Sequence, residues 1–143
     1  VVSWPDQVRK PVVYEGLVSL TDMMATLTEL AGDPIGVIPG EDSYSFAPVL
    51  NGDQGFIVRE HMVHHSSRGM FAIREGDWKY INGLGSGGFT SPASGEPGST
   101  RVSGQLYDLN IDSLEQVNLF LKYPEKIGKM KSMMVEMKNI LHN

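Results

Sequence analysis

Apolar residues recur at helical spacing in two segments of the chain, residues 19–31 and residues 124–141. In both segments the apolar positions fall on one stripe, which is typical of a helix that packs one face against other elements. Ser19 with Asp22 three residues later is a capping-box variant, and Gly32 fits a left-handed helix end. The pattern therefore predicts two amphipathic helices.

The second predicted helix carries a stripe rich in methionine, consisting of Ile127, Met130, Met133, Met134, Met137, Ile140 and Leu141. Such a stripe invites a comparison with methionine-rich binding surfaces. Methionine is also an ordinary, adaptable filler of hydrophobic cores. We favour the second interpretation, in which the helix lies across a sheet.

Short β-prone runs fill the middle of the chain. They cover residues 56–63, 70–74, 78–81 and 105–109, and Gly76 with its neighbours makes a tight hairpin turn between the second and third runs. This spacing predicts a small antiparallel sheet. Two earlier runs, residues 1–4 and 11–18, also have the pattern of strands, so the chain is expected to open as strand, strand, helix.

Two segments are rich in turn-forming residues. Residues 33–53 form a connector, with a short helical turn predicted at residues 46–50. Residues 82–104 are rich in Gly and Ser, and this stretch is too long and too polar for a simple hairpin loop. A loop of this kind is either functional or disordered.

The composition excludes several classes of function. The chain has 143 residues and a net charge of −5, which argues against a nucleic-acid groove or a polybasic membrane surface. No apolar run reaches the roughly 20 residues of a membrane span. Cys is absent, so this chain has no disulfide, thiolate metal site or cysteine nucleophile. It begins at Val1 within a predicted strand, without an initiator Met or a signal peptide, and we expect a piece of a longer protein.

Three histidines lie close together at His61, His64 and His65. On a strand, the first and third share one face and the second takes the other, so the three rings do not converge on a metal ion. One or two of these imidazoles, together with Ser66, Ser67 and Arg68, could instead bind an anionic ligand. A polar strand end at the surface explains the same residues, and both interpretations stay open.

The glycine-rich loop offers a second candidate for anion binding. The backbone amides of the glycines around Ser86 could together bind an anion as a nest; these are Gly83, Gly85, Gly87 and Gly88. The loop lacks the spacing of a phosphate loop and no helix start follows it, so nucleotide binding is unsupported. Serines without a nucleophile elbow do not indicate a serine hydrolase, and carboxylates such as Asp108 and Asp112 resemble turn and cap residues. No complete catalytic set is visible.

One stretch near the end of the chain resembles a known family motif. It begins at Gln105 and continues with Leu106, Tyr107, Asp108, Leu109, Asp112, Glu115, Asn118 and Leu119. It resembles the motif that closes the C-terminal subdomain of type I sulfatases, the arylsulfatase-like enzymes. The family usually has Pro after the position of Asp112, where this chain has Ser113. The Asp and Asn side chains are expected to bond neighbouring amides as the chain turns.

Four further segments resemble sulfatase sequences in the same order. They are Trp4 and Pro5, with Asp6 where the family has Gly; residues 18–32, with Ala25 where Pro is common; residues 41–52; and residues 64–92. The resemblance covers nearly the whole chain. It implies an α+β fold in which residues 54–143 form the C-terminal sulfatase subdomain, an antiparallel sheet of about four strands packed against a C-terminal helix. Residues 1–53 would be the end of the catalytic α/β domain, a strand-helix remnant with its linker.

The resemblance implies an enzyme that hydrolyses sulfate esters with Ca²⁺ and a formylglycine made within a Cys/Ser-x-Pro-x-Arg motif. That motif is absent from this sequence. We therefore expect formylglycine and calcium upstream of Val1, no catalytic or metal-binding residue in this chain, and no activity of the chain alone. The partner implied is a sulfated small molecule or glycan, and the residues expected to contact it are His64, His65, Arg68, Ser86 and Gly87.

Two alternatives remain beside this prediction: a phosphonate or phosphate ester hydrolase of the same superfamily, and a non-catalytic ligand-binding module. Truncation would leave a sheet edge and the apolar face of the first helix uncovered, and this predicts self-association. Members of the family are often exported or lysosomal. The absence of an Asn-x-Ser/Thr site favours a bacterial origin, and for a bacterial protein the resemblance favours a periplasmic or secreted location.

Overall fold

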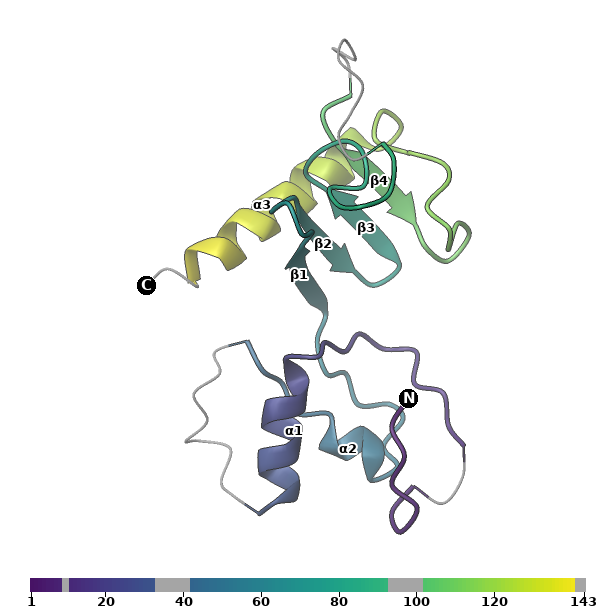
Figure 1. Cartoon of the computed structure of the whole chain (residues 1–143), viewed down its shortest axis with the longest axis vertical. Coiled ribbons are helices and arrows are strands. Elements are labelled where there is room, and N and C mark those ends of the chain that lie inside the picture. Colours follow the sequence, from purple (N-terminus) through teal and green to yellow (C-terminus); the bar gives the residue numbers. More distant parts are fainter. Residues whose placement is uncertain (9–10, 33–41, 93–101, 141–143) are drawn as a thin grey trace. The chain divides into compact units, whose positions relative to one another are not determined.

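The structure is a computed structural model of the chain, and it describes residues 1–8, 11–32, 42–92 and 102–140, with side chains described as far as residue 137. The chain divides into two compact units, Val1–Glu60 and His61–Asn143. Each unit has its own packed elements and is described by itself (Figure 1).

The second unit is built on a four-stranded sheet. Its strands are β1 (His61–His65), β2 (Phe71–Glu75), β3 (Trp78–Ile81) and β4 (Gln105–Asp108), and they lie in this order with every neighbouring pair antiparallel. A single helix, α3 (Pro124–Ile140), packs on the sheet against β2 and β3 (Figure 1). The predicted α+β fold with a C-terminal helix is confirmed.

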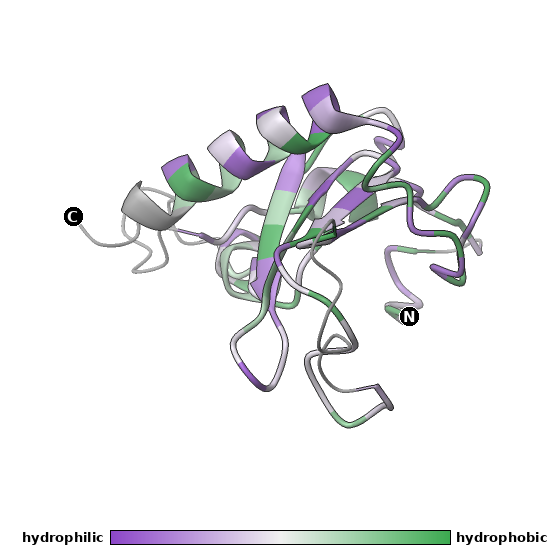
Figure 2. Cartoon of the chain, turned by 90° about the horizontal axis from the view of Figure 1, so that it is seen from above, coloured by the Kyte–Doolittle hydropathy of each residue, from purple (hydrophilic) through white to green (hydrophobic). Residues whose placement is uncertain are grey.

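The core of this unit lies between α3 and one face of the sheet. Its buried side chains are Ile73, Tyr80 and Leu106 from the sheet and Ile127, Met130 and Met134 from the helix. Met133 and Met137 pack against the edge of this core, so the methionine stripe is core filler, as predicted. Figure 2 shows hydrophobic and hydrophilic bands alternating along α3, as expected of a helix with one buried side. Leu141 and the side chain of Ile140 lie outside the described part.

The first strand begins later than predicted. β1 starts at His61, which pairs with Glu75 at the end of β2. Residues 56–60 therefore have no partner on β2, and the prediction of a strand over residues 56–63 is wrong for its first half. The turn between β2 and β3 matches the prediction, because Gly76 adopts a φ of 54° that a tight hairpin turn needs.

In its described residues the first unit has two helices, α1 (Asp22–Leu30) and α2 (Ala47–Leu50). The first is shorter than the predicted residues 19–31, but Gly32 ends it with a φ of 86°, as expected. The second lies at the predicted helical turn. No helix in the described ranges is long and apolar enough to cross a membrane.

The two strands predicted at the start of the chain are absent. Residues 1–4 and 11–18 form no strand, and the first unit contains no strand anywhere in its described residues. A β-strand needs a neighbouring strand to satisfy its backbone groups. Val-rich segments have the propensity for a strand, but here they meet no partner. The exposed sheet edge expected in this region is therefore not found either.

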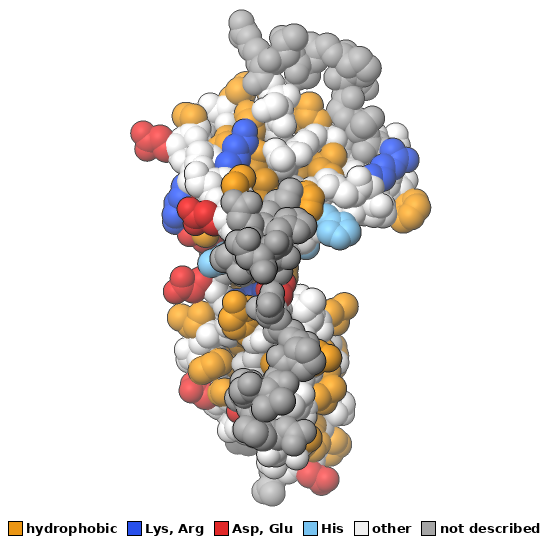
Figure 3. Space-filling view, turned by 90° about the vertical axis from the view of Figure 1, so that its left-hand side faces the viewer, with side chains coloured by type: hydrophobic (Ala, Val, Ile, Leu, Met, Phe, Trp, Pro, Cys, Tyr) orange, Lys and Arg blue, Asp and Glu red, His pale blue; other side chains and the backbone are white. Residues whose placement is uncertain are grey.

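The buried side of α1 is small and polar rather than apolar. Asp22, Ala25 and Thr26 are its buried residues. Leu20, just before the helix, and Met24 and Leu27 within it are 91%, 53% and 57% exposed, so much of the predicted apolar stripe is uncovered. Hydrophobic side chains are visible on the surface in Figure 3.

The buried carboxylate of Asp22 explains why the polar side of α1 faces inward and much of its apolar stripe is exposed. It accepts hydrogen bonds from the backbone N–H groups of Ser19 (2.7 Å) and Tyr44 (3.0 Å), and it forms an ion pair with the guanidinium of Arg59. The two charged side chains are 0% and 3% exposed. A buried charge requires such partners, so this ion pair fixes which side of α1 faces inward.

Candidate functional site

The two segments singled out in the sequence contact each other in the second unit. They are the β1–β2 turn, residues 66–70, and the glycine loop, residues 83–92. The backbone N–H of Arg68 donates to the carbonyl oxygen of Gly87 at 3.2 Å. Gly87 is buried and has a φ of 61°, and a Cβ atom there would lie 2.6 Å from Oγ of Ser66. Only glycine allows this close approach of the two segments.

The β1–β2 turn is closed by Ser66. Its N–H donates to the carbonyl of Met70 at 2.9 Å, and its hydroxyl accepts from the N–H of Met70 at 3.1 Å. Nδ1 of His65 lies 2.8 Å from the carbonyl oxygen of Ser66. A carbonyl oxygen only accepts, so Nδ1 carries the proton and Nε2 is left to interact with a ligand. Arg68 is exposed at the tip of this turn.

Ser86 organises the glycine loop from within. Its hydroxyl donates to the carbonyl of Thr90 at 2.6 Å and accepts from the N–H of Gly88 at 3.1 Å. Its own N–H donates to the carbonyl of Pro92 at 2.9 Å. The Ser86 hydroxyl therefore has no second proton for an anion, and it supports the shape of the loop instead.

His64 and His65 point to opposite faces of the sheet, as the alternation along β1 predicts. Figure 3 shows histidine side chains at the molecular surface. The face of His64 also carries Lys79, which is paired with Glu115 at 2.6 Å. Although His64 is exposed, partial burial of its ring, followed by the charge of Lys79, lowers its pKa below the usual 6.5. The neutral imidazole is favoured near pH 7.

The described residues contain no group of three or more His, Asp or Glu side chains that could hold a metal ion. The three histidines of β1 are divided between two sheet faces. They therefore do not fit a shared ion.

Gln105, named in the sequence only as the start of a motif, anchors the glycine loop, and Tyr107 holds Gln105. Nε2 of Gln105, on β4, donates to the carbonyl oxygens of Gly83 at 3.0 Å and Gly85 at 2.9 Å. Its Oε1 accepts from the hydroxyl of Tyr107 at 2.7 Å. These two residues lie on the same face of β4, two positions apart. That spacing, directly after the long polar loop, was the available signal.

The turn after β4 has the structural role expected for it. The Asp112 carboxylate accepts hydrogen bonds from the backbone of Gln116 (3.0 Å) and Val117 (2.8 Å), and these bonds lower its pKa. Oδ1 of Asn118 accepts from the N–H of Leu106 at 3.0 Å, and its Nδ2 donates to Gly104 at 3.2 Å. These side chains tie the turn to β4 and leave no catalytic role to be assigned.

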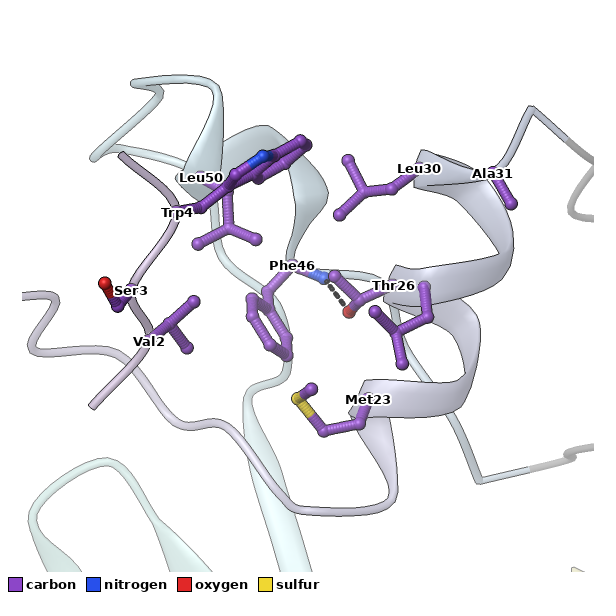
Figure 4. Close-up of a pocket in the computed structure, with 10 residues that line it drawn as sticks. Val2, Ser3, Trp4, Met23, Thr26, Leu30, Ala31, Phe46 and Leu50 are labelled. Carbon is purple, nitrogen blue, oxygen red and sulfur yellow. Dashed lines mark hydrogen bonds between the residues drawn. The ribbon is translucent and has the colours of Figure 1, made fainter. Parts of the chain in front are cut away.

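The first unit has an apolar pocket of about 380 Å³ (Figure 4). Trp4, Met23, Phe46 and Leu50 contribute to its lining. The hydroxyl of Thr26 is already engaged, since it donates to the carbonyl of Asp22 at 2.6 Å and accepts from the N–H of Phe46 at 3.0 Å. A pocket with so few polar groups does not suit a sulfate, and none of the predicted contact residues lines it.

Comparison with known proteins identifies the family. No family model matches the chain. N-acetylgalactosamine-6-O-sulfatase of Bacteroides thetaiotaomicron is 30% identical to it over 138 residues, which is 96% of the chain and 26% of that protein. Human arylsulfatase A is 30% identical over 127 residues, covering 81% of the chain and 24% of the enzyme. The chain belongs to the sulfatase family.

A further sulfatase and a solved structure are also similar to this chain. Choline-sulfatase of Rhizobium meliloti is 30% identical over 122 residues, with 80% of the chain and 21% of the enzyme covered. A solved structure from work on glycosaminoglycan metabolism by Bacteroides thetaiotaomicron superposes with a TM-score of 0.63 and 28% identity, covering 82% of the chain and 24% of the structure. The chain spans about a quarter of the length of these relatives.

A second solved structure extends the likeness in fold alone. It is a protein in complex with its substrate D-glucosamine-2-N,6-O-disulfate, with a TM-score of 0.57 and 21% identity, and 82% of the chain and 23% of that structure are covered. Over 82% of its length the chain thus shares its fold with both solved structures. The resemblance inferred from the sequence motifs is confirmed by whole-chain similarity.

Proposed function

We propose that this chain is the C-terminal portion of an enzyme that hydrolyses sulfate esters. The observation that carries the proposal is the similarity over 96% of the chain to a protein named as a sulfatase. We assign residues 54–143 to the C-terminal subdomain and residues 1–53 to the end of the catalytic α/β domain. The second compact unit, His61–Asn143, falls within the first of these two ranges.

The substrate we propose is a sulfated sugar. The named relative that covers most of the chain acts, by its name, on 6-O-sulfated N-acetylgalactosamine, and the disulfated glucosamine bound in one solved structure is also a sulfated sugar. A sulfate ester keeps its negative charge at every physiological pH, so it requires donors and positive charge from the protein. In a chain of net charge −5 those donors must be local.

The β1–β2 turn and the glycine loop supply such donors. Arg68 brings a guanidinium, which matches two oxygens of an anion. His65 has Nε2 available, and Gly87 holds the loop backbone against the turn. Ser86 keeps the loop in shape. His64 lies on the sheet face opposite His65, the face that also carries Gln105, so we propose it as a contact separate from that of His65.

The formylglycine and calcium implied by the family do not fit the residues of this chain. Cys is absent, no Cys/Ser-x-Pro-x-Arg motif is present, and the described ranges hold no group of three or more His, Asp or Glu side chains that could bind a metal ion. We place both groups in the rest of the protein and derive no step of the reaction through them. The part proposed for this chain is to bind and orient the substrate.

The test compares p-nitrophenyl sulfate with p-nitrophenyl phosphate as substrates of the complete protein. We expect release of nitrophenol from the sulfate and none from this 143-residue chain alone. Arg68→Gln should raise the KM for sulfate esters by about tenfold, since a charge-assisted hydrogen bond is lost. Arg74→Gln, which removes the same charge from a strand position, is the matched control. Preferred turnover of the phosphate would replace this proposal by the phosphate ester alternative.

A further inference from the structure

We propose that Gln105 is a positioning residue, held by Tyr107, that fixes the glycine loop against the β1–β2 turn. The proposal rests on the proposed function, because it concerns the same candidate site. The side chain of Gln105 forms its hydrogen bonds with Gly83, Gly85 and Tyr107, and none of these residues belongs to the β1–β2 turn. It acts through the loop.

The chemistry at position 105 admits only one orientation of the amide. Both loop groups facing the side chain, at Gly83 and Gly85, are carbonyl oxygens and can only accept. The –NH₂ end must therefore face the loop, and the oxygen must face Tyr107. A carboxylate at this position would have no proton for either carbonyl and would repel both of them.

Tyr107 completes the arrangement from the opposite end. Its side chain lies on the sheet face away from α3, the residue is only 6% exposed, and its hydroxyl donates to Oε1 of Gln105. Burial, and then the charges of Glu115 and Asp112, raise the pKa of this phenol, so the hydroxyl is a donor at neutral pH. The orientation of the amide is thus fixed by a protonated group at neutral pH.

The anchored carbonyls lie immediately before the functional part of the loop. Gly85 precedes Ser86 and Gly87, and the carbonyl of Gly87 accepts the hydrogen bond from the backbone of Arg68. Movement of Gly85 would therefore be transmitted across two residues to the turn that carries Arg68. A residue that positions substrate contacts should affect KM more than kcat.

The experiment substitutes Gln105→Glu in the complete protein and measures two quantities. The first is hydrogen exchange at the amides of Arg68, Ser86 and Gly88, all of which are hydrogen-bonded in the structure. The second is KM and kcat for a sulfated sugar. Gln116→Glu, at an exposed position of the same unit, introduces the same charge as a control. Protection of α3 amides checks that the fold is intact.

We expect Gln105→Glu to speed exchange of the three amides by at least about tenfold and to raise KM by a similar factor, with kcat nearly unchanged. Tyr107→Phe keeps the amide donors and should give a smaller change of the same kind. It also replaces Gln105→Glu if that variant fails to fold.

Unchanged loop exchange in both variants would overturn the inference. Faster loop exchange with an unchanged KM, in an enzyme that still releases sulfate, would overturn the link to substrate while leaving the proposed function intact. If the wild-type protein released no sulfate, the proposed function would fail instead, and loop exchange would still decide whether Gln105 anchors the loop.

Discussion

The buried ion pair of the first unit gives a quantitative prediction about its stability. Asp22 accepts hydrogen bonds from Ser19, Tyr44 and two nitrogens of Arg59, and it has no exposed surface. Asp22→Asn retains the size of the side chain but removes its charge. It also turns an amide –NH₂ toward groups that are themselves donors. The guanidinium of Arg59 is then left buried with the more distant Asp42.

The expected loss of unfolding free energy follows from the burial of this ion pair. Removing one partner of a buried pair costs about 3–5 kcal/mol, because the remaining charge stays buried without compensation. The same change at Asp42 is a control. Its carboxylate is 41% exposed and 3.5 Å from Arg59, so Asp42→Asn should cost no more than about 1 kcal/mol. A factor of ten in an equilibrium constant corresponds to about 1.4 kcal/mol. The loss expected for Asp22→Asn therefore raises the equilibrium constant for local unfolding of α1 at least about a hundredfold.

Hydrogen exchange of the α1 amides measures this opening directly. We expect Asp22→Asn to accelerate exchange in α1 at least about a hundredfold, and Asp42→Asn less than about tenfold. The double variant Asp22→Asn with Arg59→Met should regain part of the loss, because no unpaired charge stays buried. An acceleration below tenfold in Asp22→Asn would show that the buried ion pair does not stabilise α1 as argued. Faster α1 exchange in the double variant than in Asp22→Asn would show the same.

Three further predictions concern the second unit and the surface of α1. Asn118→Ala removes three hydrogen bonds, to Leu106 of β4, to Gly104 just before β4 and to Phe120 within the turn, and should lower the unfolding free energy by about 1–3 kcal/mol in urea, whereas exposed Asn110→Ala should leave it nearly unchanged. The lowered pKa of His64 means that the unfolded chain binds a proton first as pH falls below 6.5. The contribution of His64 to the unfolding free energy is thus complete above that pH and is lost as pH falls through the pKa of the folded state. On acidification, Tm should therefore fall less in His64→Gln than in the wild-type chain, and an identical fall would contradict this. Exposed Met24 and Leu27 should drive concentration-dependent self-association of the 143-residue chain, which light scattering would detect and which Leu27→Lys should weaken; a strict monomer would count against it.

Local patterns carried much of the fold. The four short runs and the final helix were predicted because each has its own periodicity; Gly76 marked the turn between the second and third runs, and Gly32 marked the end of the first helix. The strands expected at residues 1–4 and 11–18 failed, because valine content reports propensity but does not supply a neighbouring strand.

Long-range partners were the part that sequence could not provide. Asp22 was recognised as a cap, yet its main partner is Arg59, 37 positions away. The β1–β2 turn and the glycine loop were each selected as candidates, but nothing in their spacing indicated that Gly87 meets Arg68. Gln105 was noticed only as the start of a motif. Its two acceptors are 20 and 22 residues distant, and no periodic pattern encodes such a contact.

We propose that this chain belongs to an enzyme that hydrolyses sulfate esters on sugars. The most direct measurement is the release of inorganic sulfate from N-acetylgalactosamine 6-sulfate by the complete protein, followed by ion chromatography, with the corresponding 6-phosphate as comparison. The account predicts sulfate release by the wild-type protein and a raised KM in Arg68→Gln. Release of phosphate but no sulfate, or equal binding of the sulfated and unsulfated sugars, would contradict it.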